Sequence, residues 1–144
     1  MCNSLAPAPY RAPSDAADEK DSRREYPPAP EPLPVPVMDN HTHLDFRHGL
    51  IEVSVRDAMD SAEAVGVQGA IQVGCDLESS RFTVQAVEAD PRLLGAVAIH
   101  PNDAPEYAAR GELESALAEI EALAGHPRIR AIGGDRAGLL PNPR

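Results

Sequence analysis

The sequence has few cysteines and no long apolar run, and each shortage argues against a class of protein. Its 144 residues include two cysteines. Cys2 lies near the start of the chain and Cys75 follows a predicted strand, so a disulfide framework is not expected. No run of about 18 apolar residues predicts a transmembrane helix. The N-terminal region also lacks the apolar stretch of a signal peptide. A cytoplasmic location is therefore the default expectation.

Positive charge is also in short supply. The chain has 13 basic and 23 acidic residues, which gives a net charge of −10. Such a balance leaves no global basic patch of the kind that attracts long duplex DNA. A bound divalent ion would still allow phosphate binding, because its large local positive charge can hold a phosphate even in an acidic protein. The charge therefore argues against long DNA more than against a short phosphate ester.

Large apolar side chains are almost absent from residues 1–34. This segment is rich in proline, alanine and charge and has no hydrophobic period. Such a composition cannot bury enough apolar surface to offset the entropy of ordering, so we expect residues 1–34 to be disordered. The remainder has room for one domain.

Four apolar segments alternate with helical patterns in that remainder. The strands that they predict cover residues 35–39, 69–73, 93–99 and 129–132. Capping residues and helical apolar spacing predict three helices between them, beginning near Ser54, at Asp76 or Ser79, and at Pro105. This alternation is typical of βαβ units, and hence of a parallel sheet covered by helices. It fits either a doubly wound sheet or half of a (β/α)8 barrel.

A His-x-His pair follows the first predicted strand. Side chains at positions i and i+2 of a strand share a face, so His41 and His43 can direct both imidazoles at one ion. Neutral imidazole suits zinc, manganese, iron or nickel, and a catalytic site needs further ligands and an open position for water. Asp39 and Asp45 flank the pair and could orient its rings. Two such histidines can also be bonded by carbonyls or solvent alone.

The ends of the later strands carry further candidate residues. Ligands bind at the carboxyl ends of the strands in both candidate architectures. His100 follows the third strand, which would bring three histidines to one rim. Its alternative role is an anchor of a turn, donating to a carbonyl. Cys75 is expected to be a small buried apolar residue rather than a thiolate ligand. His48 and His126 are expected in surface loops.

Two segments resemble the TatD family of metal-dependent hydrolases. Residues 38–45, Met-Asp-Asn-His-Thr-His-Leu-Asp, resemble its opening signature, and residues 98–102, Ala-Ile-His-Pro-Asn, resemble the segment after its third strand. The resemblance runs from residue 35 to residue 133. It implies an α/β fold, namely a (β/α)8 TIM barrel of the amidohydrolase type, truncated here to about four strands and three helices. It also implies hydrolysis of phosphodiester bonds, as in a deoxyribonuclease, with a divalent metal ion such as zinc, magnesium or manganese.

The resemblance assigns roles to four residues. His41 and His43 would be metal ligands, and Asp45 and His100 would lie next to the metal or on the substrate side. The family also uses a glutamate after the fourth strand, two later histidines and a later aspartate, which we do not expect in these 144 residues. We therefore expect weak metal binding, little or no turnover on a short DNA substrate, and self-association through open sheet edges. The alternatives are a non-enzymatic metal-binding or chain-pairing fragment and an amidohydrolase of C–N bonds.

Residues 134–142 depart from the family pattern. After Gly133 the family reads Glu-Thr-Gly-Leu-Asp-Tyr-Phe-Arg-Thr, whereas this chain reads Gly-Asp-Arg-Ala-Gly-Leu-Leu-Pro-Asn. The codons GAG ACC GGG CTG GAC TAC TTC CGA ACC encode the family residues. One added G in front of them encodes the residues of this chain. We therefore expect residues 134–144 to be an out-of-frame tail, caused by a truncated gene or a sequencing error.

Overall fold

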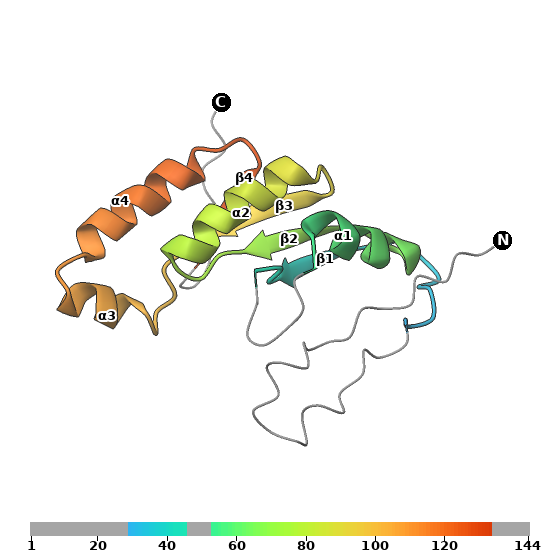
Figure 1. The fold of residues 1–144 in the computed structure, drawn as a ribbon, viewed down its shortest axis with the longest axis horizontal. Helices are drawn as coiled ribbons and strands as arrows, with labels where there is room; N and C mark the ends of the chain where they lie inside the picture. The colour runs from blue at the N-terminus through green and yellow to red at the C-terminus, as the bar shows by residue number, and fades with distance from the viewer. Residues whose placement is uncertain (1–28, 46–52, 134–144) are drawn as a thin grey trace, which may run out of the picture.

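The structure, a computed structural model, describes residues 29–45 and 53–133, and in these ranges strands alternate with helices around one sheet (Figure 1). The strands are β1 (Val37–Thr42), β2 (Val67–Val73), β3 (Leu93–Val97) and β4 (Ile129–Ile132). The helices are α1 (Val55–Ala64), α2 (Leu77–Ala89), α3 (Ala104–Ala109) and α4 (Leu113–Ala124). All neighbouring strands are parallel, as the sequence predicts.

The order of the strands separates the two candidate architectures. Their order in space is β1-β2-β3-β4, the same as in the chain. Because crossovers between parallel strands are right-handed, a sheet that grows in one direction keeps its helices on one face. The contacts agree, since α2 packs against both α1 and α4, and Figure 1 shows these three helices along one side of the sheet. A doubly wound sheet would reverse its order at a switch point, so the described part has the arrangement of a barrel.

The predicted helix starts are confirmed by their caps. The side chain of Ser54 accepts from the N–H of Asp57 at 3.1 Å and begins α1. Asp76 and Ser79 form a capping box at the start of α2, in which each side chain accepts from the other residue's main-chain N–H. Two donors that the first turn leaves unpaired are thereby satisfied. The helix ends at Asp90, directly before a proline, as predicted.

The prediction of one long helix after Pro105 is wrong. The structure has α3, which ends at Ala109, and a separate α4, which begins at Leu113. Gly111 between them has a φ of +71°, a left-handed conformation that a right-handed helix cannot include. The described ranges therefore hold four helices instead of three.

The bounds of three strands also differ from the prediction. Strand β1 covers residues 37–42 instead of 35–39, so that it includes His41. Strand β2 begins at Val67, two residues before its predicted start, and β3 ends at Val97, two residues before the end of its apolar run. These differences arise because the ends of a strand depend on its pairing with the neighbouring strand, which the hydrophobic period of a segment does not report.

The hydrophobic core lies between the helices and strands β2 to β4. Its largest fully buried side chains include Met59 of α1, Val87 of α2, and Leu93 and Val97 of β3. The exposed edge strand β1 contributes little, because its first five residues are all exposed. One face of the sheet near β1 is therefore open to solvent.

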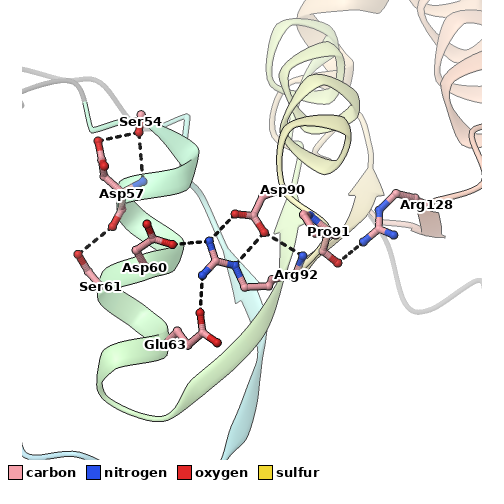
Figure 2. A network of polar contacts seen from close by, with 9 residues as sticks. All are labelled: Ser54, Asp57, Asp60, Ser61, Glu63, Asp90, Pro91, Arg92 and Arg128. Atoms are coloured by element: carbon pink, nitrogen blue, oxygen red, sulfur yellow. Dashed lines mark hydrogen bonds and ion pairs between the residues drawn. The ribbon is translucent and has the colours of Figure 1, made fainter.

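A polar cluster joins α1 to the turn between α2 and β3 (Figure 2). The guanidinium of Arg92 donates to Asp60 and Glu63 of α1 at 2.7 and 2.6 Å, and to Asp90 at 2.9 and 2.5 Å. Because Asp90 accepts these bonds, Arg92 lowers the pKa of its carboxyl group. The cluster lies at the amino end of β3, whereas the histidines lie at the carboxyl end of β1. It holds α1 against the turn that precedes β3.

Several predictions fall on residues outside the described ranges. The predicted disordered segment 1–34 lies mostly there, as do His48 and the predicted out-of-frame tail 134–144. Residues 29–34 are described: they are exposed and lie outside any helix or strand. Within them the N–H of Leu33 donates to the carbonyl of Val65 at 2.9 Å. The chain therefore contacts the domain slightly before residue 35.

Among the helices in the described ranges, none is long and apolar enough to cross a membrane. Helix α2 has 13 residues, whereas a membrane span needs about 20.

Candidate metal centre

Strand β1 ends at the two histidines that the sequence singles out. His41 lies in the strand, and His43 follows its last residue. The Nε2 atoms of the two rings are 3.1 Å apart, and the ring planes stand at 73° to each other. The structure therefore brings both imidazoles together at the carboxyl end of β1.

An irregularity in β1 shapes this end of the strand. Asp39 pairs with Ala70, and Thr42 pairs with Gln72, so β1 carries an extra residue relative to β2. A bulge of this kind bends a strand and re-aims its side chains. The main-chain N–H of His41, inside the bulge, donates to Oδ1 of Asp39 at 3.0 Å. This bond satisfies a donor of the bulged segment.

The ring of His43 is held by a main-chain carbonyl. Its Nδ1 lies 2.8 Å from the oxygen of Val73, the last residue of β2. A carbonyl oxygen only accepts, so in the neutral ring Nδ1 carries the proton and Nε2 presents a lone pair. The Nε2–H group of His41 then donates to that lone pair. This is the usual arrangement of a metal-binding histidine, in which the second ring nitrogen donates to a fixed acceptor.

Two imidazoles at this spacing fit one divalent ion. Nitrogen ligands at about 2.0–2.1 Å from a tetrahedral zinc ion stand about 3.4 Å apart, close to the 3.1 Å between these Nε2 atoms. His41 has to transfer its proton from Nε2 to Nδ1 before it can bind, and its residue is exposed to the water that mediates such exchange. In the part of the chain that the structure describes, no three His, Cys, Asp or Glu side chains are placed to hold a metal. The described ranges therefore bring two imidazole nitrogens together, without a third side chain of these kinds placed to hold a metal with them.

Sequence reasoning missed Gln72, which lies against this segment. Its Oε1 accepts from the N–H of Leu44 at 2.7 Å, and its Nε2 donates to Oδ1 of Asp45 at 3.0 Å. The carboxylate of Asp45 thus accepts a hydrogen bond from a side-chain amide of β2. A signal was present in the sequence, since Gln72 is a polar residue inside the apolar run of residues 69–73.

Cys75 also lies near the His43 ring. Its Sγ is 4.0 Å from Nδ1, the nitrogen that faces the carbonyl and not the one with the lone pair. Partial burial raises the pKa of the thiol above its usual value of 9.0, and the carboxylates of Asp45, Asp76 and Asp103 raise it further. The raised pKa favours the protonated thiol at neutral pH. Cys75 is half-buried, and not the fully buried residue that the sequence predicts.

His100 forms the turn that follows β3. Its main-chain N–H donates to the carbonyl of Cys75 at 2.6 Å, which joins the ends of β3 and β2. Its ring Nδ1 accepts from the N–H of Asn102 at 3.1 Å. The ring therefore anchors a turn as an acceptor, and not as the donor that the alternative reading expects. Residue 100 is exposed and follows β3 at the carboxyl end of the sheet, the end at which the histidine pair lies.

His126 lies in the turn before β4, at the amino end of the strands, whereas the histidine pair lies at the carboxyl end. Its Nδ1 accepts from the N–H of Arg128 at 3.2 Å, and its Nε2 is 3.4 Å from Glu88. The residue is half-buried and joins a turn to α2. The prediction of a loop position is confirmed, but the residue is not on the open surface.

A parallel sheet in sequential order, with its helices on one face and a histidine pair at the carboxyl end of its first strand, is the arrangement expected at the beginning of a (β/α)8 barrel. The family model described as TatD related DNase matches residues 38–135, and the chain belongs to this family. An uncharacterized metal-dependent hydrolase TatD of Mycobacterium tuberculosis (strain ATCC 25618 / H37Rv) is 39% identical over 97 residues. The predicted family and the predicted barrel-type α/β fold are thereby confirmed.

The similarity covers unequal shares of the two chains. The aligned residues make up 67% of this chain and 35% of the Mycobacterium tuberculosis protein. The chain thus spans about a third of the length of the curated relative that it matches. The four strands of the described ranges correspond to the beginning of a (β/α)8 barrel, which contains eight.

Proposed function

We propose that His41 and His43 are two ligands of a divalent metal ion, and that the whole protein hydrolyses phosphodiester bonds, as in a short DNA. The family description, TatD related DNase, supports the class of substrate. The name of the Mycobacterium tuberculosis relative, a metal-dependent hydrolase, supports the cofactor. The identity of the metal, zinc, magnesium or manganese, is an outcome of the experiment below.

One geometric observation carries the proposal. The two Nε2 atoms are 3.1 Å apart, and the Nδ1 of His43 is bonded to the Val73 carbonyl. The carbonyl bond turns the Nε2 of His43 toward the Nε2 of His41, and the two atoms share a hydrogen bond. A divalent ion would take the place of this bond between the same two atoms, once the proton of His41 has moved to Nδ1.

The residues of this chain would orient the metal and admit the substrate. A divalent ion supplies Lewis-acid polarisation of a phosphoryl oxygen and lowers the pKa of a bound water toward about 7. The carbonyl of Val73 holds the ring of His43 and fixes the direction of its Nε2. His100, an exposed residue after β3, would lie on the substrate side of the metal.

We further propose that residues 1–144 alone bind metal weakly and turn over little or no substrate. Catalytic zinc sites use about three protein ligands and an open position for water, whereas the described ranges bring together two. A chain that carries two ligands holds an ion without the geometry that hydrolysis requires.

Metal binding by the double variant His41→Ala/His43→Ala tests this function. Calorimetric titrations with Zn²⁺, Mg²⁺ and Mn²⁺ identify the metal that the unchanged chain binds, and the variant should not bind that metal, because both nitrogen ligands are gone. His126→Ala is the matched control. It removes a ring at the amino end of the strands, away from the pair, and should leave metal binding unchanged. Equal binding by the double variant and the unchanged chain would place the metal elsewhere.

A second candidate function is association of chains through β1 without catalysis. Strand β1 is an edge strand, and its Val37 and Met38 are 38% and 56% exposed. Exposed apolar edge strands pair readily with other strands. Sedimentation of the unchanged chain should then show dimers or larger species that Met38→Lys reduces. A monomer at all concentrations would exclude this candidate.

A further inference from the structure

Gln72 is a buried polar residue that forms hydrogen bonds with the segment after the histidines and with the carbonyl of the next residue in β2. Its residue is 0% exposed in β2, where the neighbouring side chains are apolar. Burial of an unpaired amide is unfavourable, so such a residue is stable only where its partners are held in place. The opposite end of the same strand carries Gln68, whose residue is exposed.

The partners fix the orientation of the amide. Leu44 offers an N–H, which can only donate, so the atom 2.7 Å from it is the acceptor Oε1. The Nε2 of Gln72 therefore points to Oδ1 of Asp45 at 3.0 Å and to the carbonyl of Val73 at 3.4 Å. Every contact is consistent with this one orientation.

The Val73 carbonyl is the same one that accepts from the ring of His43, at 2.8 Å. The amide of Gln72 thus contacts the acceptor of the ring and also the two residues that follow the ring in the chain. A segment held at Leu44 and Asp45 cannot move away from β2 without breaking these bonds. The position of His43 over Val73 follows from this attachment.

We propose that Gln72 is a positioning residue for the histidine pair: it fastens residues 44 and 45 to β2, so that His43 keeps its Nδ1 on Val73 and its Nε2 toward His41. This role rests on the metal site proposed above. Gln72 does not touch the ion. It acts through Leu44, Asp45 and the shared carbonyl, in the way that partners of metal ligands commonly set ring direction.

The variant Gln72→Met tests the role in the full 144-residue chain. Methionine has a similar length and shape but offers none of the three bonds. We expect Zn²⁺ affinity to fall about 10- to 100-fold, the usual effect of losing a partner of a metal-binding residue. Gln68→Met is the matched control on the same strand, and Thr83→Val removes a buried hydrogen bond of α2, far from the histidines. Both should leave Zn²⁺ affinity unchanged.

A metal-free readout separates positioning from general stability. Nuclear magnetic resonance of the metal-free chain should show faster amide exchange at Leu44 in Gln72→Met. The ¹⁵N shifts of the His43 ring should move toward a mixture of the two tautomers. Thr83→Val should change neither signal. If Gln72→Met does not fold, Asp45→Ala removes one of the same bonds at a half-exposed position and should change the same signals in the same direction.

The outcomes distinguish this role from the metal site itself. If the unchanged chain and Gln72→Met bind Zn²⁺ equally while the double histidine variant does not, the positioning role is wrong and the metal site stands. If the unchanged chain binds no Zn²⁺, the metal site is wrong. The metal-free signals then decide: unchanged exchange at Leu44 and unchanged His43 shifts overturn the positioning role, and altered ones support it.

Discussion

We expect the buried carboxylate of Asp90 to contribute strongly to the stability of this domain. Its side chain is 2% exposed and accepts three bonds from Arg92, from the main-chain N–H at 2.9 Å and from the guanidinium at 2.9 and 2.5 Å. The change Asp90→Ala removes all three. Hydrogen bonds to charged groups contribute about 1.5–3 kcal/mol each, but Arg92 keeps Asp60 and Glu63, so we expect a total loss of about 2–3 kcal/mol.

The pH dependence of this loss has a definite sign. Arg92 lowers the pKa of the Asp90 carboxyl in the folded state below its unfolded value. A depressed pKa means that the stabilisation is fully present above the unfolded pKa of about 3.9 and disappears as the pH falls through the folded pKa. The difference in unfolding free energy between the unchanged chain and Asp90→Ala should therefore be constant from pH 7 to 5 and shrink in stronger acid.

Urea unfolding followed by circular dichroism, repeated between pH 7 and pH 3, measures both effects. Asp60→Ala is the matched control, because Asp60 also bonds Arg92 but its side chain is 58% exposed. An exposed ion pair contributes about 0–1 kcal/mol, so this variant should lose much less. Equal losses in the two variants, or a difference that grows in acid, would refute the reasoning.

Three further predictions concern the chain outside the polar cluster. Gly111→Ala should destabilise the domain by about 1–2 kcal/mol in urea unfolding, because φ is +71° there and alanine disfavours the left-handed region; an unchanged midpoint would contradict this. Limited proteolysis should remove most of residues 1–34 and leave a core that begins close to residue 29, since Leu33 bonds Val65; protection of the whole segment would argue against a disordered tail. Nucleotide sequencing across the codons for residues 133–142 should show that deletion of one base restores a frame through Glu-Thr-Gly-Leu-Asp-Tyr, and the absence of such a frame would rule out the frameshift.

Local features of the fold could be predicted from the sequence. The caps at Ser54 and Asp76 and the bounds of β4 agree with the structure, because each depends on residues within a few positions of one another. The alternation of strands and helices is also local in origin, and it correctly predicted a parallel sheet. The His-x-His motif itself was visible for the same reason.

The break between α3 and α4 could be predicted only in part from the sequence. Gly111 stands in the sequence as a signal, but apolar spacing before and after it is compatible with one helix. Only the backbone shows that φ is positive at this residue, so that the chain turns before α4 begins. The different bounds of β1 have the same origin, because they follow from the bulged pairing with β2.

The tertiary structure alone decided the sheet order and the environment of the histidines. The hydrophobic period of a segment shows which face is buried, but not which strand pairs with which. The sequence was therefore compatible with both a doubly wound sheet and a barrel. The carbonyl that holds the ring of His43 comes from Val73, 30 positions away, and the amide of Gln72 reaches Leu44 across 28. Contacts at such separations exist only once β1 and β2 are paired. The sequence therefore determined which groups could bind a metal, and the pairing of strands determined which atoms orient them.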